Sequence, residues 1–223
     1  MESKLKIAIL GGTGALGSGF AKLWARAGHP IIIGSRSKDK AAEFARSIST
    51  TQNMQVSGED MLTAARLADV VLLAVPFSSH EETLKEIKEE VQGKIVIDAV
   101  VPLVPPKVST VQLPKEGSAS VIAQQILGDH AHVVAAYHNV GAAKLQNPGP
   151  VDCDVLICGN EKEARDTVIA LTETAGLRGI DAGLLANAVA AEALTSILIG
   201  INRRYKVDCA GIRITGLDSV KST

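Results

Sequence analysis

A glycine-rich turn near the N-terminus has the residue types and the spacing that bind a diphosphate. Gly12, Gly14 and Gly17 fit the pattern G-x-G-x-x-G directly after a short apolar run. In this pattern the first glycine permits a tight turn, the second lets a pyrophosphate approach the backbone, and the third lets the next helix pack closely on a sheet. The N-terminus of that helix presents free N–H groups and a positive dipole end to the phosphates. We therefore predict a dinucleotide site here, the alternative being a glycine-rich turn without a ligand.

The residues that follow the second apolar run, 31–33, indicate which dinucleotide binds. NAD enzymes usually place Asp or Glu there, because the carboxylate accepts hydrogen bonds from the adenosine ribose. This chain has Ser35 and Arg36 instead, and Lys40 lies further on in the next helix. A guanidinium can form a charge-assisted fork with a phosphate while it stacks on adenine. We therefore predict binding of NADP through its 2′-phosphate; the alternative is a basic, solvated helix start.

The elements that position these residues alternate along the chain. We expect strands at residues 5–10, 31–33, 70–75, 95–97, 132–136, 154–158 and 177–181, and helices at 14–27, 38–48, 59–67, 79–91, 120–127, 161–175 and 184–204. This alternation predicts an α/β protein of the Rossmann type, with a doubly wound, mostly parallel sheet. Four prolines between residues 102 and 114 mark a long loop. We place a boundary near Gly183, between an NADP-binding domain (1–183) and a small helical C-terminal domain (184–223).

The composition excludes several other classes of protein. Hydrophobic residues make up 46% of the chain, charged residues 21%, and the net charge is −1. Such a chain has no general affinity for nucleic acid or for anionic membranes. Residues 1–6 lack the apolar run of a signal peptide, and we find no stretch of the roughly 20 apolar residues that a membrane helix needs. The three cysteines have no zinc or redox spacing, so we expect no metal site and a cytoplasmic location.

Beyond these local patterns, the chain resembles a known family. Residues 9–17, 28–29 and 34–36 resemble the F420-dependent NADP oxidoreductases, and the similarity continues at 74–76, 133–138, 155–159, 176–178, 181–183, 192–195, 203 and 211–212. The first block is shared with pyrroline-5-carboxylate reductases and membrane ferric reductases. The resemblance implies hydride transfer between the deazaflavin ring of coenzyme F420 and C4 of the NADP nicotinamide. It also implies a homodimer, and a cleft for the stacked rings between the large domain and the C-terminal helices.

The resemblance also implies roles for particular residues. The expected NADP contacts are Thr13, Gly14, Ala15 and Leu16 in the turn, and Ser35, Arg36 and Lys40 after the second strand. The nicotinamide end would be lined by Val75, Val101 and Ala142. Ala210 would touch F420 through its backbone.

Hydride transfer between two planar rings needs close stacking and the exclusion of water, and little acid–base catalysis. Val75, Pro76 and Val101 are apolar walls suited to this need. We name His138 as the candidate catalytic residue, because it follows a strand and can hydrogen-bond a carbonyl or N1 of the deazaflavin. The alternative is a loop histidine with a structural partner.

Several other polar residues have two interpretations each. Glu192 and Thr195 share a helix face, where they either line the cleft or join core contacts. Asp98 ends a strand, where it either has a cap or loop role or forms part of the site. No sequence pattern indicates a partner for His80, His130 or His132. The basic cluster formed by Arg203, Arg204 and Lys206 either ends a helix in solvent or binds the anionic tail of F420.

Two other functions are open to such a chain. It could reduce a small imine or carbonyl compound with NADPH, although only about forty residues follow Gly183 to enclose such a substrate. It could also be a non-catalytic NADP-sensing module.

Overall fold

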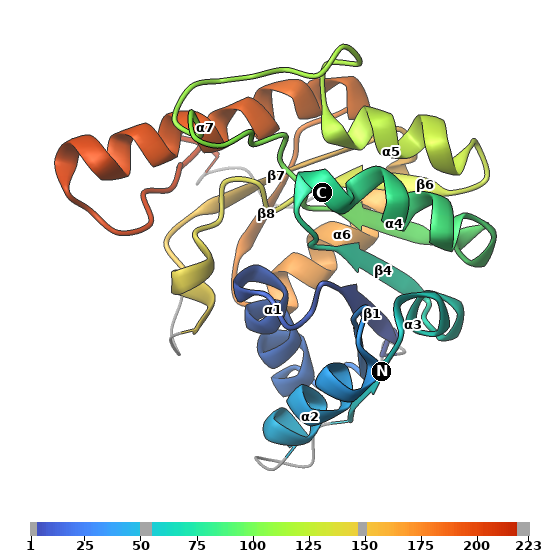
Figure 1. Ribbon diagram of the computed structural model, residues 1–223. Coiled ribbons are helices and arrows are strands. Elements are labelled where there is room, and N and C mark those ends of the chain that lie inside the picture. The colour runs from blue at the N-terminus through green and yellow to red at the C-terminus, as the bar shows by residue number, and fades with distance from the viewer. Residues whose placement is uncertain (1–3, 50–54, 147–150, 218–223) are drawn as a thin grey trace.

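A central sheet of eight strands organises the described residues, 4–49, 55–146 and 151–217 of the computed structural model (Figure 1). The strand order is β3-β2-β1-β4-β5-β6-β7-β8. Neighbouring strands are parallel except β6 and β7, which are antiparallel. The strands are β1 (Ile7–Leu10), β2 (Ile31–Gly34), β3 (Val56–Glu59), β4 (Val70–Leu73), β5 (Ile95–Asp98), β6 (His132–Ala135), β7 (Asp154–Gly159) and β8 (Arg178–Asp181). The predicted Rossmann-type, mostly parallel sheet is confirmed.

Helices cover both faces of the sheet. They are α1 (Ala15–Arg26), α2 (Lys38–Ser49), α3 (Met61–Leu67), α4 (His80–Ile87), α5 (Ala119–Leu127), α6 (Lys162–Thr174) and α7 (Ala188–Tyr205). Alternate side chains of a strand point to opposite faces. Ile7 and Ile9 of β1 accordingly pack with apolar residues of α1, α2 and α6, whereas Ala8 and Leu10 pack with those of α3, α4 and α5. The continuous apolar strands seen in the sequence therefore follow from a sheet that is buried on both faces.

One strand was not expected from the sequence. β3 contains a single large apolar residue, Val56, so it shows neither an apolar run nor a clear alternation. It is held by its neighbours: Ile31 pairs with Val56, and a Cβ at Gly58 would overlap the backbone of α2 at Ala41. The helix expected from residue 59 begins at Met61 instead, because Asp60 caps it by accepting a hydrogen bond from the Thr63 N–H (2.8 Å).

The long helix α7 is fastened to the sheet domain through a buried carboxylate. Glu192 accepts hydrogen bonds from the N–H groups of Ala119 (2.6 Å) and Ser120 (3.0 Å), and from the Ser120 hydroxyl (2.7 Å). Ser118 accepts from Val121 N–H (3.1 Å) at the same helix end. The first N–H groups of a helix have no partner within the helix, so α7 supplies two of the acceptors that the N-terminus of α5 requires.

By length and composition alone, the segment Leu185–Tyr205 could cross a membrane, contrary to the expectation that no stretch qualifies. The difference arises because its many Ala, Ile and Leu residues outweigh its polar residues when the segment is averaged. In this structure Glu192 binds α5, and the Thr195 hydroxyl donates to the carbonyl of His138 (2.7 Å). These polar contacts tie α7 to the globular fold. Residues 1–3 and the C-terminal extension 218–223 lie outside the described residues.

Replacing Glu192 with alanine is expected to lower the free energy of unfolding by about 3 kcal/mol, because buried N–H groups at the start of α5 lose their acceptor. Urea denaturation at pH 5, below the pKa of about 7 of Glu192, measures this change. Glu81→Ala is the control, because the carboxylate of Glu81 is largely exposed and its pairing with Lys85 contributes little. A loss no larger than that of the control would contradict the fastening role of Glu192.

Candidate functional site

A cleft of about 380 Å³ opens at the carboxyl ends of β1, β2 and β4. This edge of a doubly wound sheet is where ligands bind. The residues that line the cleft come from the glycine-rich turn, from the ends of β2 and β4, and from α3 and α4: Gly11, Thr13, Gly14, Ser35, Arg36, Met61, Ala74, Val75, Pro76, Ser79, Glu82, Thr83 and Glu86. The fold thus brings together six residues predicted from the sequence: Thr13, Gly14, Ser35, Arg36, Val75 and Pro76.

The glycine-rich turn is shaped by close approaches of the backbone. Gly11, rather than Gly12, has the left-handed backbone, with φ of 82°. Gly12 is needed for space, because a Cβ there would lie 2.8 Å from the carbonyl oxygen of Ile9. At Gly17 a Cβ would lie 2.7 Å from the carbonyl oxygen of Gly11. Gly12 and Gly17 are buried and support the turn from beneath, whereas Thr13, Gly14 and Ala15 are exposed.

The N-terminus of α1 lacks a side-chain cap. Gly14 is the N-cap residue of this helix and has no side chain with which to bind the first N–H groups. Ala15 and Leu16 follow it as the first two helical residues. Their N–H groups have no carbonyl partner within the helix, and they point, with the helix dipole, towards the cleft that Gly14 lines. Such an end binds phosphate without any charged side chain.

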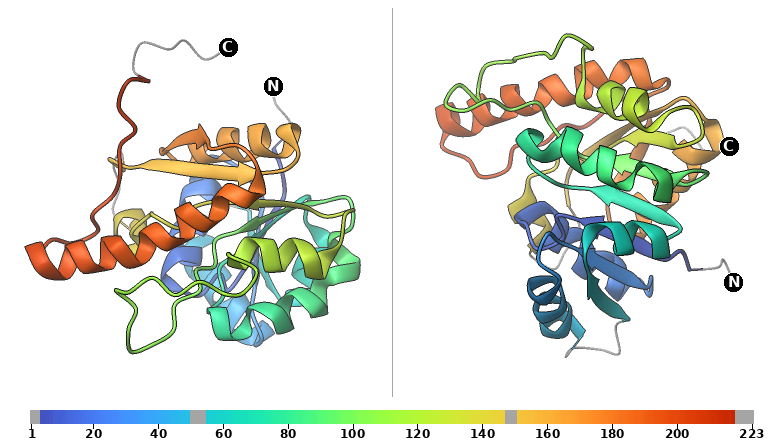
Figure 2. Two further views of the ribbon diagram at one scale, coloured as in Figure 1. Left: turned by 90° about the horizontal axis from the view of Figure 1, so that it is seen from above. Right: turned by 45° about the vertical axis from the view of Figure 1, so that its right-hand side comes forward.

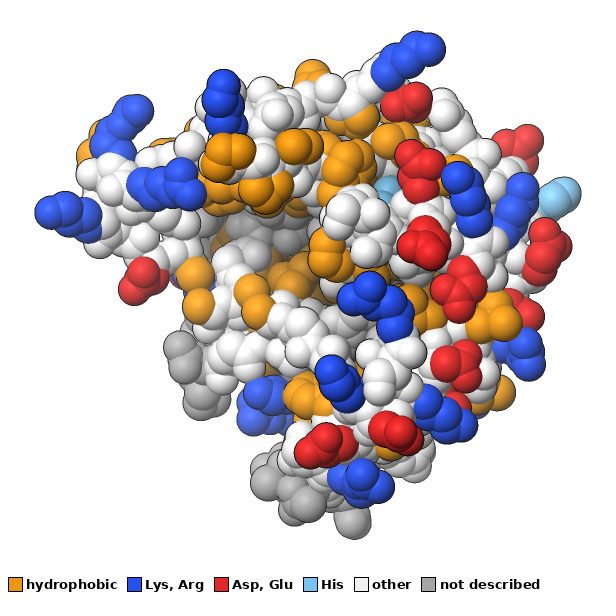
Figure 3. Space-filling model, viewed as in Figure 1, with side chains coloured by type: hydrophobic (Ala, Val, Ile, Leu, Met, Phe, Trp, Pro, Cys, Tyr) orange, Lys and Arg blue, Asp and Glu red, His pale blue; other side chains and the backbone are white. Residues whose placement is uncertain are grey.

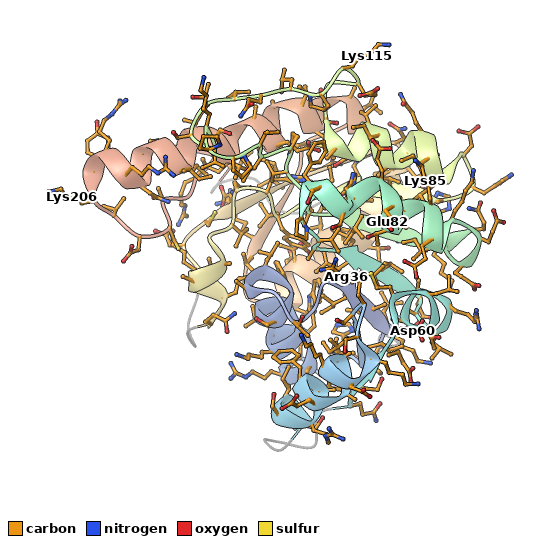
Figure 4. The ribbon with its side chains drawn as sticks, in the orientation of Figure 1. Arg36, Asp60, Glu82, Lys85, Lys115 and Lys206 are labelled. Atoms are coloured by element: carbon orange, nitrogen blue, oxygen red, sulfur yellow. The ribbon has the colours of Figure 1, made fainter. Side chains whose placement is uncertain are left out.

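The end of β2 supplies the cationic side of the cleft. Arg36 is exposed and lines the cleft, and Figure 4 shows it facing Glu82 of α4 across that space. Glu59, at the end of β3, is in register with Gly34 and is bound by Lys38 at 2.7 Å. Glu59 is therefore paired with Lys38 rather than with Arg36, and Glu82 and Glu86 of α4 line the same cleft as Arg36. Lys40 is exposed on the first turn of α2, outside the residues that line the cleft.

The apolar side of the site comes from the loops after β4, β5 and β6. Val75 and Pro76 follow β4 and line the cleft, whereas Val101 and Ala142 do not. Ala142 begins a 3-10 turn, Ala142–Gln146, and the side chain of Gln146 donates to the carbonyl of Ala15 (2.9 Å). This contact brings the turn after β6 against the start of α1. Ala210 follows α7, and its N–H already donates to Asn202 (2.8 Å), which leaves its carbonyl for a ligand.

A second hollow lies below α7 (Figure 3). Apolar side chains gather along its rim, which is formed by α7 and by the loop between β5 and α5, residues 99–118. The two segments run side by side (Figure 2), and Arg203 of α7 donates to the hydroxyl of Ser109 (3.3 Å). Their exposed apolar residues are Val104, Val111, Leu113, Ile197 and Ile201. Uncovered apolar side chains on facing segments suit the binding of a flat ring.

Behind these loops lies a cluster of buried titratable groups. Burial lowers the pKa of His138 to about 4 and raises that of Glu192 to about 7. Nε2 of His138 lies 4.0 Å from the Glu192 carboxylate, and both side chains are fully covered. His138 is therefore neutral at pH 7. His80, for which the sequence showed no partner, is paired with Asp98, its Nε2 lying 2.9 Å from the carboxylate.

Some residues that line the cleft, and the pairing of His80 with Asp98, were not predicted from the sequence. Met61 follows the strand β3, which the sequence did not indicate. Ser79 ends the 3-10 turn before α4, and Glu82, Thr83 and Glu86 belong to α4, whose facing direction the sequence left open. His80 and Asp98 are 18 positions apart, in a helix and a strand, and form no short motif.

Two glycine substitutions separate binding from folding. Gly14→Val is expected to weaken NADPH binding by about 10- to 100-fold, because it places a side chain where the phosphates meet the backbone. It leaves the fold intact, since a Cβ at Gly14 meets only the carbonyl oxygen of Gly11, at 3.2 Å. Gly17→Ala is expected to lower thermal stability, because its Cβ meets backbone atoms at 2.7 and 2.8 Å. NADPH fluorescence titration and thermal melts distinguish the two. Unchanged NADPH affinity in Gly14→Val would contradict the phosphate site.

Neutral His138 gives stability a pH dependence. Its pKa falls from 6.5 to about 4 on folding, so the unfolded chain takes up a proton first as the pH falls. The resulting contribution to the free energy of unfolding is fully present above pH 6.5 and falls by roughly 3 kcal/mol as the pH approaches 4. Glu192 acts in the opposite direction, because its pKa rises from 4.5 to about 7. Its contribution is present below pH 4.5 and is lost as the pH rises to 7.

The variant His138→Gln isolates the histidine contribution. The difference in free energy of unfolding between the wild type and this variant is expected to shrink as the pH falls from 7 to 4.5, as measured by urea denaturation. A difference that stays constant over this range would contradict a buried, neutral His138.

Comparisons with known proteins agree with this geometry. Residues 6–102 match the family described as NADP oxidoreductase coenzyme F420-dependent. The chain is 41% identical to an F420-dependent NADP reductase of Methanocaldococcus jannaschii, over 96% of this chain and 100% of that protein. It is 40% identical to one of Methanothermobacter marburgensis, over 96% and 99%. The crystal structure of a candidate F420-dependent NADP reductase of Arthrobacter sp. FB24 superimposes with a TM-score of 0.80 at 25% identity, over 95% of this chain and 99% of that one. The chain therefore belongs to the family of F420-dependent NADP oxidoreductases.

Proposed function

We propose that this protein transfers a hydride between coenzyme F420 and NADP. In one direction the reduced deazaflavin gives up a hydride and a proton, and NADP⁺ accepts the hydride at C4 of its nicotinamide to become NADPH. The observation that carries the proposal is the cleft in which an uncapped helix N-terminus and Arg36 lie on one side and apolar strand-end loops on the other. The family membership of the whole chain supports the same reaction.

We propose one orientation for NADP in this cleft. Its diphosphate would lie at the turn, against Thr13, Gly14 and the N–H groups of Ala15 and Leu16, with Gly12 and Gly17 packed beneath. The 2′-phosphate would lie at Arg36, with Ser35 and Lys40 as further contacts. The nicotinamide would then point towards the loops that carry Val75, Pro76, Val101 and Ala142. Arg36 at the end of β2 and the apolar residues directly after β4 support this arrangement, although Glu82 and Glu86 of α4 also line the cleft.

Coenzyme F420 would bind in the hollow below α7. Apolar side chains of α7 and of the 99–118 loop form its rim, and they would exclude water from the stacked rings. We propose that residues 184–223 act as the small helical domain that holds F420, with the backbone of Ala210 as a contact. We propose that His138, the candidate catalytic residue of the sequence, acts as a positioning residue. Because it is neutral and covered, it would act as a hydrogen-bonding group from behind the site rather than as a proton donor at its surface.

We further propose that the protein is a cytoplasmic homodimer. Ile197, Ile201 and Tyr205 lie four residues apart along α7, on one face, and are 49%, 36% and 68% exposed. A stripe of this kind on a helix favours burial against another surface. A second copy of α7 would cover the part of this stripe that the F420 hollow leaves exposed, and would also account for the apolar composition of this helix without a membrane.

A direct assay tests the reaction. NADP⁺ mixed with chemically reduced F420 and the protein is expected to produce NADPH and restore the deazaflavin absorbance, whereas reduced FMN gives no enzyme-dependent rate. If F420 does not react but a cyclic imine is reduced by NADPH, the protein is an imine or carbonyl reductase. NADPH binding without oxidation by any of these acceptors would indicate a sensing module.

The variant Arg36→Ala tests the preference for NADP. Loss of a charge-assisted contact with the 2′-phosphate is expected to raise the dissociation constant of NADPH by about 10- to 100-fold and that of NADH by less than about threefold. Lys206→Ala is the matched control, because it removes an exposed cation at the far end of α7 (Figure 4). Equal effects of Arg36→Ala on both dinucleotides would show that Arg36 does not recognise the 2′-phosphate.

A further inference from the structure

The buried pair of His80 and Asp98 lies where three loops of the site diverge. Asp98 is the last residue of β5, in register with Leu73 of β4 and Ala135 of β6. Its carbonyl accepts from the N–H of Ala136 (3.2 Å). Beyond these residues, β4 leads into the loop that carries Val75 and Pro76, β5 into the loop that carries Val101, and β6 into the loop that carries His138. Asp98 is thus placed at the common base of the apolar side of the cleft.

The carboxylate of Asp98 connects two of these loops directly. One oxygen accepts from the N–H of Val100 (3.0 Å), the residue before Val101. The other lies 2.9 Å from Nε2 of His80. His80 is the first residue of α4, and only the 3-10 turn Phe77–Ser79 separates it from Pro76. A single buried group therefore holds the Val100–Val101 loop and the Val75–Pro76 loop at fixed positions relative to each other.

The contribution of this pair to stability does not by itself explain its presence. Both side chains are fully buried, and Nδ1 of His80 has no hydrogen-bond partner in the described part of the chain. Burying a polar pair in this way gives little net stabilisation over apolar residues of similar size, and an unpaired buried nitrogen adds a cost. We therefore expect the pair to fix the positions of these loops. The two hydrogen bonds of the Asp98 carboxylate are directional, whereas apolar contacts are not.

We propose that His80 and Asp98 are positioning residues for hydride transfer, which set the separation of the two apolar walls that hold the nicotinamide ring. The proposal rests on the proposed function in placing the nicotinamide at these loops. The pair does not touch the cofactor; it acts through Val75, Pro76 and Val101. Removal of the hydrogen bond would let the ring tilt or shift, and a displacement of about 1 Å can reduce the rate of a reaction by about 100-fold.

Two amide substitutions at His80 test this role as a matched pair. The amide nitrogen of glutamine can take the place of Nε2 and donate to Asp98, whereas the shorter asparagine reaches only the place of Nδ1. His80→Gln is expected to keep kcat within about threefold of the wild type. His80→Asn is expected to lower kcat by about 10- to 100-fold and to change the KM for NADPH by less than about threefold, with a larger primary isotope effect from NADPH deuterated at C4. Trp24→Phe is the control, because it removes a buried hydrogen bond to Leu171 (2.8 Å) on another face of the sheet.

Two binding measurements distinguish a loss of the positioning role from a loss of folding and from a failure of the proposed function. Binding of 2′,5′-ADP, which reports only the adenosine end, is expected to be unchanged in both variants and shows that they are folded. The fluorescence of bound NADPH reports the surroundings of the nicotinamide without turnover, and it is expected to change in His80→Asn only. A wild-type protein that does not react with F420 contradicts the proposed function, and the fluorescence then decides the positioning role. Equal kcat and equal fluorescence in the two variants, or a loss in Trp24→Phe as large as in His80→Asn, would overturn the proposal.

Discussion

The N-terminus of α1 keeps its backbone N–H groups free, and most of the site follows from that requirement. The first N–H groups of a helix need acceptors from outside the helix, which side chains, water or a ligand can supply, and the N-cap here is Gly14, which has no side chain. The turn that carries it must pass between β1 and the start of the helix with no room for side chains at Gly12 and Gly17. The resulting surface is exposed backbone with a positive potential, and an anionic ligand is the partner that completes it.

The N-terminus of α5 differs from that of α1, because its first N–H groups have side-chain acceptors. At α5 the N–H groups are satisfied from a distance, by Glu192 of α7 together with the local cap Ser118. Burial of this carboxylate raises the pKa of Glu192, and burial of the neighbouring imidazole lowers the pKa of His138 and keeps it neutral. The same contact fixes α7 above the sheet edge, where its apolar residues and those of the 99–118 loop form the rim of the hollow. One helix end is thus open for a ligand, and the other is closed to hold the element that shapes the rest of the site.

Much of the fold was predictable because its signals are local. The strands β1, β2, β4 and β5 are short apolar runs buried on both faces, and the helices between them have clear starts, so their order alone indicates a parallel, doubly wound sheet. The strand β3 was not predictable, since its pattern is weak and its place depends on pairing with β2 and on the close approach of α2 at Gly58. The sequence pattern assigned the tight turn to Gly12, and the structure gives the left-handed backbone of this turn to Gly11, because consecutive glycines do not distinguish the two positions.

The sequence by itself determined the glycine-rich turn, the absence of an acidic residue directly after β2, and the cation Arg36 in its place, because each lies within a few residues of a strand end whose direction the fold class fixes. Only the tertiary structure decided how the remaining groups meet. It paired His80 with Asp98, placed Glu192 at the start of α5, set Lys38 against Glu59, and laid the Ala142–Gln146 turn on α1. Most of these contacts join residues tens of positions apart. The two buried ones, at Asp98 and Glu192, form because buried polar groups must find partners once the chain has closed around them.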